Sequence, residues 1–137
     1  YSRKIVCLSG FSGIITSSET GYKLSSNPDT VRAPDMAFKS KEKLAGSGGI
    51  VKDYSSVMPD LVVEVNSPSD SYTKIAGKVN DWLKAGVSMV WVIDPINRAV
   101  AVYNSSGRCV VLQENNMLDG GDILTGFKCR AGDIFII

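Results

Sequence analysis

Hydrophobic residues recur at helical spacing in one stretch of the chain, and this pattern predicts a helix. Four residues make up the apolar face: Ile75, Val79, Trp82 and Leu83. Ser67 followed three residues later by Asp70 resembles a capping box, so we expect the helix to begin near Ser69. Gly86 is a typical residue just beyond the end of a helix.

Short apolar runs on both sides of this helix predict strands. The runs cover 61–65 and 88–94, and a strand–helix–strand unit places its two strands parallel. Residues 99–104 and 108–113 flank an Asn-Ser-Ser-Gly turn and predict an antiparallel hairpin. We therefore expect an α/β (α+β) architecture with a mixed sheet flanked by helices and an additional C-terminal β-hairpin region.

The N-terminal part of the chain has weaker patterns. Residues 1–12 fit the end of an amphipathic helix, and because the chain begins at Tyr1 we expect this helix to be incomplete. Residues 19–24 alternate as a strand does. Residues 31–38 predict a further strand, which Pro34 interrupts or confines to a sheet edge.

A charged and then Gly/Ser-rich stretch, 39–56, predicts a surface loop, and we expect it to be the most mobile part of the chain beyond the termini. Its lysines are the natural source of a local basic surface: Lys39, Lys41, Lys43 and Lys52. The C-terminal tail predicts short strands around Ile123-Leu124 and over 133–137.

Composition narrows the chemistry. The 137 residues predict one domain, 1–137, and no run of 18 apolar residues is present, so we expect a cytoplasmic protein without a membrane partner. The chain has no histidine, which excludes Ser-His-Asp and Cys-His nucleophilic systems, and its three cysteines form no CxxC pair. Carboxylates that bind a hard metal such as Mg²⁺ remain open. The net charge of +1 gives no support to a nucleic-acid partner.

Glu64 stands out because it interrupts an apolar strand. Alternation puts Glu64 and Val62 on the strand face opposite to Val63. Asp35, directly after Pro34, lies among apolar neighbours in the preceding strand. If the two strands pair, both carboxylates converge near one end of the sheet. A strand-end glutamate that reaches solvent or a lysine, and an aspartate that only shapes a turn, are the structural alternatives.

Two carboxylates brought close together repel each other, and a divalent cation such as Mg²⁺ or Mn²⁺ relieves the repulsion. We therefore expect the Asp35 and Glu64 carboxylates within roughly 6 Å of each other. Lys74 and Lys78 lie on one face of the following helix. Helix lysines usually form a solvated face, but Lys78 borders the apolar stripe and is the better candidate to reach a metal site.

Five segments occur in an order that is found in a known family: ETGYKL, VRAPDMAF, PDLVVEVNSPSD, GKVNDWLKAGV and VWVIDP. Together they resemble the Uma family of putative restriction endonucleases, over nearly all of the chain from about Ser18 onward. The resemblance implies a restriction-endonuclease-like fold with the PD-(D/E)xK metal site of many nucleases. It also implies a Mg²⁺ or Mn²⁺ cofactor and DNA as the partner.

Carried over residue by residue, the resemblance implies three catalytic residues, Asp35, Glu64 and Lys78. Position 66 is Asn where the simple pattern has Lys, so Lys78 takes the place of a lysine that has migrated to the helix. Asp35 and Glu64 would bind the metal together with the backbone carbonyl of Val65.

Two further acids match recurrent family positions. Glu19 is a candidate additional metal ligand or support of a ligand, and Asp60, at the far end of the strand from Glu64, is more consistent with a structural role. Lys74 is the competitor of Lys78.

The leading hypothesis is a metal-dependent endonuclease that hydrolyses phosphodiester bonds of DNA. The alternative is a non-catalytic binding or assembly module on a nuclease-like scaffold, which the near-zero net charge and Asn66 keep open. A metal-free structural protein is a third. We also weigh a homodimer, formed through the helix that carries Trp82 and the hairpin with its exposed aliphatic residues.

Overall fold

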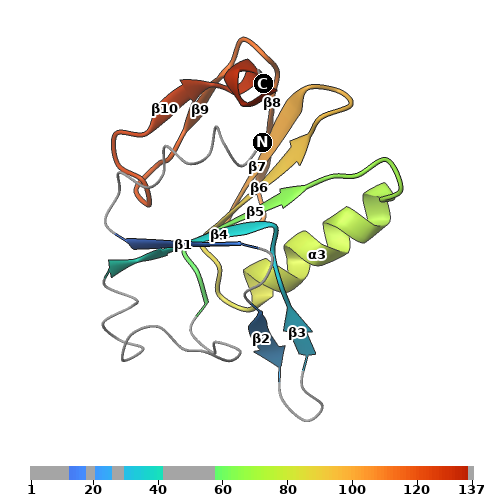
Figure 1. Ribbon diagram of the computed structural model, residues 1–137, viewed down its shortest axis with the longest axis vertical. Coiled ribbons are helices and arrows are strands. Elements are labelled where there is room, and N and C mark those ends of the chain that lie inside the picture. The colour runs from blue at the N-terminus through green and yellow to red at the C-terminus, as the bar shows by residue number, and fades with distance from the viewer. Residues whose placement is uncertain (1–12, 18–20, 26–29, 42–57, 136–137) are drawn as a thin grey trace.

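A six-stranded mixed sheet runs through the described part of the chain, which comprises residues 13–17, 21–25, 30–41 and 58–135 of the computed structural model (Figure 1). In spatial order its strands are β1 (Gly13–Ser17), β4 (Met36–Ser40), β5 (Leu61–Val65), β6 (Met89–Asp94), β7 (Ala99–Asn104) and β8 (Cys109–Leu112). β5 and β6 are parallel, and every other neighbouring pair in this sheet is antiparallel. The predicted mixed sheet, its parallel pair and its hairpin are confirmed.

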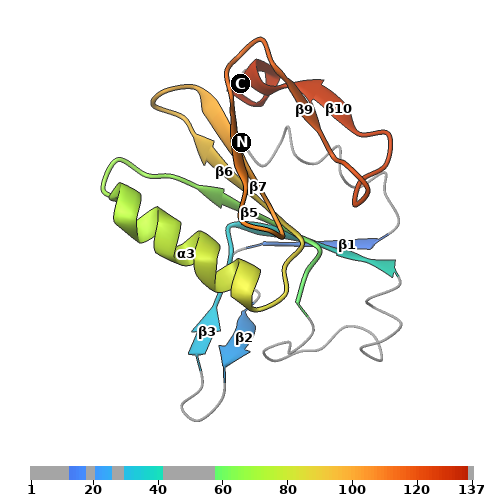
Figure 2. The ribbon, with the colours of Figure 1, turned by 180° about the vertical axis from the view of Figure 1, so that it is seen from behind.

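Helix α3 (Tyr72–Lys84) connects β5 to β6 and covers one face of the sheet (Figures 1 and 2). Its buried residues are those of the predicted apolar stripe, Ile75, Val79 and Trp82. They pack on Val62 of β5 and on Val90 and Val92 of β6, with the buried ring of Tyr22 at the edge of the cluster. Burying this stripe removes apolar surface from water and fixes the helix on the sheet.

The C-terminal tail covers the opposite face of the sheet (Figures 1 and 2). It contains β9 (Met117–Asp119), β10 (Lys128–Arg130) and the 3₁₀ helix η2 (Ala131–Phe135). Apolar tail residues, among them Leu118, Leu124 and Phe127, pack against Leu61 and Trp91 of the sheet. The strands expected around Ile123-Leu124 and over 133–137 are wrong: the first pair lies in a turn, and η2 occupies 131–135.

A separate two-stranded ribbon, β2 (Tyr22–Ser25) and β3 (Thr30–Arg32), stands beside the C-terminal half of α3. The rings of Tyr22 and Trp82 meet edge to face with centroids 6.0 Å apart, and Arg32 pairs with Asp81 at 2.7 Å. The interruption predicted at Pro34 is confirmed, because β3 ends before it and β4 begins after it. β4 lies inside the sheet, between β1 and β5.

Three expectations for local structure need correction or lie outside the described residues. Lys39 was assigned to the surface loop, but it lies in β4 and is 7% exposed, with its ammonium 5.3 Å from the centre of the Tyr22 ring. The incomplete helix over 1–12 and most of the expected mobile loop, 42–56, lie outside the described residues. β1 was not predicted, since its five residues carry no clear alternation.

The start of α3 also differs from the expectation. The helix begins at Tyr72, slightly later than the expected start near Ser69. Ser71 is its N-cap, and the Ser71 hydroxyl accepts a hydrogen bond from the Lys74 amide at 3.1 Å. Ser67 and Asp70 instead form a turn before the helix, in which Asp70 Oδ2 accepts from both the amide and the hydroxyl of Ser67. None of the helices among the described residues is long and apolar enough to cross a membrane.

Candidate functional site

The antiparallel pairing of β4 with β5 brings Asp35 beside Glu64. Met36 pairs with Val63, so Asp35, the residue before β4, lies next to the C-terminal end of β5. There its Oδ2 accepts a hydrogen bond from the Val65 amide at 2.7 Å. This bond satisfies a strand-end donor and anchors the Asp35 side chain at the edge of the site.

Glu64 points to the α3 face of the sheet, as the alternation predicted, and is only 4% exposed. The solvent-reaching alternative is therefore wrong. Its Oε1 accepts a hydrogen bond from the indole Nε1 of Trp82 at 3.1 Å. The same indole is fully buried in the helix–sheet core, so the bond holds the carboxylate in one orientation.

The surroundings of Glu64 favour its neutral form. Burial in the core is the main reason why the pKa of Glu64 rises from 4.5 to about 7, and the nearby negative charge of Asp35 is the second. The Trp82 hydrogen bond and the positive charges of Lys78 and Arg32 lower this pKa, but by less than burial raises it. A buried carboxyl that titrates near neutral pH beside a second carboxylate is a typical feature of a functional site.

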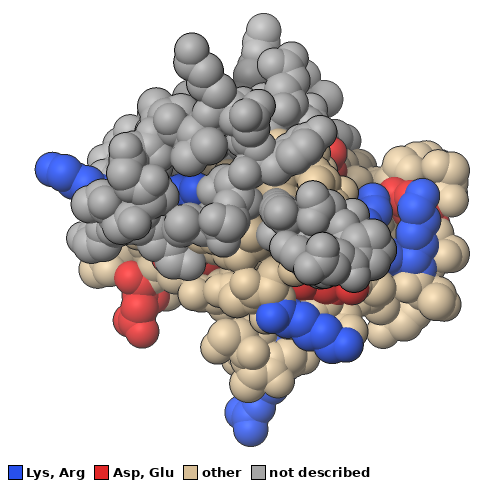
Figure 3. All heavy atoms as spheres, turned by 90° about the horizontal axis from the view of Figure 1, so that it is seen from below, with Lys and Arg blue, Asp and Glu red and all other residues tan. Residues whose placement is uncertain are grey.

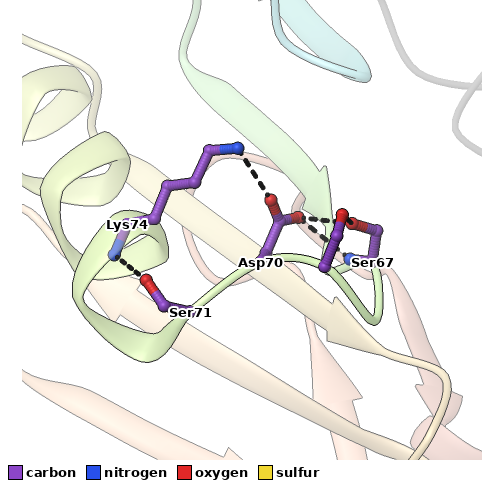
Figure 4. Close-up of polar contacts among 5 residues, drawn as sticks. Ser67, Asp70, Ser71 and Lys74 are labelled. Carbon is purple, nitrogen blue, oxygen red and sulfur yellow. Dashed lines mark hydrogen bonds and ion pairs between the residues drawn. The ribbon is translucent and has the colours of Figure 1, made fainter.

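The two candidate lysines of α3 behave differently. The Lys74 ammonium reaches back to Asp70 Oδ1, at 3.1 Å, and belongs to the turn that precedes the helix (Figure 4). Among the described residues Lys78 forms no hydrogen bond or ion pair, while its charge acts on Glu64. Lys78 is thus the lysine that the fold leaves available to the carboxylate pair.

Arg32 belongs to the same neighbourhood and was missed by the sequence analysis. Its Nη2 pairs with Asp81 of α3 at 2.7 Å, its charge lowers the pKa of Glu64, and its buried Nε has no hydrogen-bond partner within the part of the chain that the structure describes. Trp82 was identified only as a core residue. A buried indole needs an acceptor for its N–H, and this rule was the available signal that Trp82 would bind a polar group.

Neither of the two further acids, Asp60 and Glu19, is placed beside the carboxylate pair by the described residues. Asp60 lies at the opposite end of β5 from Glu64, and its carboxylate accepts a hydrogen bond from the Ser40 amide at 2.6 Å. This hydrogen bond links the end of β4 to the residue that precedes β5. Glu19 lies outside the described residues. Within the described ranges no group of three or more acidic, cysteine or histidine side chains gathers in one place.

Two carboxylate oxygens of the pair remain available. Asp35 Oδ1 and Glu64 Oε2 accept no hydrogen bond from the described residues, while the other oxygen of each carboxylate is held by Val65 or Trp82. Hard oxygen donors in a repelling pair fit a divalent cation such as Mg²⁺, which binds through one or two carboxylates and keeps several waters.

Basic side chains are not concentrated on the face shown in Figure 3. On the described part of this face, Lys and Arg side chains lie at several separate places, and Asp or Glu side chains lie beside some of them. Lys41 is exposed, whereas Lys43 and Lys52 lie outside the described residues. The predicted basic surface of the loop therefore stays a prediction, without Lys39.

Comparison with known proteins agrees with this architecture. The Uma2 family model, described as a putative restriction endonuclease, matches residues 8–132. The crystal structure of a putative nuclease belonging to DUF820 from Anabaena variabilis superposes with a TM-score of 0.82 at 20% identity, covering 98% of this chain and 76% of that one. No curated protein matches the chain. The fold match supports the expected restriction-endonuclease-like fold.

Proposed function

Because the chain belongs to the Uma2 family of putative restriction endonucleases, we propose that it is a divalent-metal-dependent endonuclease that hydrolyses phosphodiester bonds of DNA. One observation carries the proposal beyond family membership. A buried carboxyl, Glu64, lies beside Asp35 on a face where an apolar residue would pack, and the charge of Lys78, which has no ion-pair partner among the described residues, acts on it. Burying a carboxyl lowers the stability of the folded protein, and a role in catalysis explains why the carboxyl is present.

Asp35 and Glu64 are the residues that would hold the metal, with the Val65 carbonyl as the third proposed oxygen. A divalent ion bound there would supply Lewis-acid polarisation of the phosphodiester. Metal binding requires Glu64 to be ionised, and the positive charges of Lys78 and Arg32 favour that form. Trp82 fixes Oε1 through its N–H, which leaves Oε2 oriented for the ligand role.

Lys78 is proposed to stabilise the negative charge that develops on the phosphate during hydrolysis. Its ammonium has no competing partner among the described residues, in contrast to Lys74, which is bound to Asp70. A fixed positive charge next to a partly desolvated site acts more strongly than one in water. The lysine that the simple motif places on the strand, at position 66, is thereby replaced from the helix.

Magnesium-dependent nicking of supercoiled plasmid DNA tests the proposal. We expect nicking with Mg²⁺ or Mn²⁺, none with EDTA, and a loss of at least about 10²-fold in Asp35→Asn and in Glu64→Gln. Asp122→Asn, which changes an exposed carboxylate of the tail, is the matched control and should retain activity. Metal-independent nicking, or full activity in Glu64→Gln, would refute the proposed site. DNA binding without any cleavage would instead support the non-catalytic module.

A further inference from the structure

A cavity of about 500 Å³ lies on the α3 face of the sheet, lined by residues of α3, β6, β7 and β8. Val92, which pairs with Glu64 in the β5–β6 register, forms part of its wall. Asn66, two residues after Glu64, and Ile75, one helical turn before Lys78, also line it. The volume is within the range of small-ligand pockets. Asp35, Glu64 and Lys78 do not line the cavity, but Val92 and Asn66 make it a neighbour of the candidate active site.

Charge indicates which part of a nucleotide the cavity accepts. Its lining residues include no Lys or Arg, and the one ionised side chain is Asp94. Both oxygens of Asp94 are used within the following turn, where they accept hydrogen bonds from the Ile96 and Asn97 amides and the Asn97 side chain. A negative charge without a cation disfavours a phosphate, so the cavity suits a neutral group.

Asn66, which lines the cavity, carries a buried polar atom: its Oδ1 has no hydrogen-bond partner among the described residues. Because this oxygen has almost no accessible surface, the Asn66 side chain must turn to another rotamer before a ligand can reach it. A buried acceptor that is left unpaired costs free energy, and a ligand that brings an N–H donor removes this cost. An amide side chain can also accept from an amino group while donating to the neighbouring ring nitrogen of a base.

Two tyrosines add flat apolar surface to the cavity. Tyr72, at the first position of α3, is 84% exposed at the rim, and Tyr103 of β7 lies deeper. Small side chains, including Ala99 and Ala101, leave the space between them open. Aromatic side chains with room beside them are the usual platform for stacking an unpaired base.

We propose that this cavity binds one unstacked nucleobase of the substrate strand, and that the base carries an exocyclic amino group, as adenine, cytosine and guanine do and thymine does not. The amino group donates to Asn66 Oδ1, the base stacks at Tyr72, and its phosphate lies toward Glu64 and Lys78. The inference rests on the proposed nuclease function, which supplies the nucleic-acid substrate. It assigns Asn66, at the position where the simple motif has a lysine, the role of a base-contacting residue.

Binding of single deoxynucleotides tests the cavity without any cleavage. The probes are dAMP, dCMP, dGMP and dTMP, added to the protein in EDTA and followed by NMR chemical shifts or calorimetry. We expect dAMP, dCMP and dGMP to bind at least about tenfold more tightly than dTMP, whose base has no exocyclic amino group. Tyr72→Ala, which removes an exposed ring, should weaken dAMP binding by about tenfold. Ala101→Phe, which fills the cavity, should weaken it at least as much, and Ile96→Ala is the exposed apolar control.

Failure of the cavity and failure of the nuclease function give different results. No binding of any nucleotide, equal binding in Ala101→Phe, or a preference for dTMP would overturn the base pocket even if plasmid DNA is cleaved. Binding of dAMP that is lost in Ala101→Phe, together with no plasmid cleavage, would keep the base pocket and reject the endonuclease. Asp122→Asn, which changes an exposed carboxylate that does not line the cavity, should bind dAMP as the original chain does.

Discussion

Replacing Glu64 by Gln should make the protein more stable at neutral and alkaline pH while abolishing its activity. Glutamine has the shape of the protonated glutamate, and its Oε1 can keep the hydrogen bond from Trp82 Nε1. Its side-chain amide also has an acceptor nearby in the Asp35 carboxylate, whose charge opposes ionisation of Glu64. What the substitution removes is the ability to carry a negative charge in the core.

The size of the effect follows from proton linkage. The pKa of Glu64 rises from 4.5 to about 7 on folding, and each pKa unit corresponds to about 1.4 kcal/mol. Below about pH 4.5 the carboxyl is protonated in both states and contributes nothing. As pH rises from there to about 7 the unfolded chain releases the proton and the folded chain keeps it, so stability falls. Above about pH 7 the loss levels off at about 3 kcal/mol, a large part of a typical 5–15 kcal/mol total.

Urea unfolding of both proteins across pH measures this directly. We expect Glu64→Gln to be more stable by about 2–3 kcal/mol at about pH 8 and by less than about 1 kcal/mol at about pH 5. All other titrating groups are shared, so the difference between the two profiles isolates Glu64. A glutamine variant that is less stable at about pH 8, or a difference that does not change with pH, would refute the reasoning.

Magnesium provides an internal control. A ligand that binds only the folded state stabilises it, by about 1.4 kcal/mol at ten times its Kd. Mg²⁺ should therefore stabilise the original chain at about pH 8 and leave Glu64→Gln unaffected. Equal stabilisation of both proteins would place the cation elsewhere.

The remaining predictions concern charge placement and packing. Lys78→Ala should lower magnesium-dependent cleavage by about 10²-fold or more, and Lys74→Ala much less, because Lys74 is bound to Asp70 whereas Lys78 has no partner among the described residues. Plasmid nicking rates of the two variants decide the ranking. Gly77→Ala should stabilise α3 by about 0.5–1 kcal/mol in thermal or urea unfolding, since a Cβ at Gly77 meets no atom within 4 Å. Gly120→Ala should destabilise the protein by about 1–3 kcal/mol in the same assay, because its Cβ would lie 2.5 Å from Leu124.

The sheet centre and α3 were predictable because their patterns are long and depend on burial. The apolar runs of β5 and β6 and the helical stripe of Ile75, Val79 and Trp82 bury the residues that the sequence marked. The helix start was less predictable, since two serines compete for the cap. Ser67 is used in a turn by Asp70, and only the three-dimensional path shows that Ser71 is free to cap.

The C-terminal tail was the least predictable part. β9 and β10 have three residues each, too few for any periodicity, and η2 follows them directly. These elements are fixed by packing of residues such as Leu118 and Phe127 on Trp91, which is remote in sequence. The same limitation hid Arg32, because its position beside Glu64 depends on the β2–β3 ribbon standing next to α3.

Glu64 is difficult to explain as a structural residue. Its neighbours on the α3 face, Val62, Val92 and Trp82, form an apolar core in which a neutral side chain of the same size would cost less. The Trp82 hydrogen bond does not require a charge, since a glutamine oxygen accepts it equally well. A bound cation would favour the charged form below the pH at which Glu64 otherwise ionises, and Asp35 and Lys78, which both act on this carboxyl, are the proposed second ligand and charge partner. Glu64 therefore lowers the stability of the folded protein above neutral pH, and a role in catalysis explains why a carboxylate occupies this position.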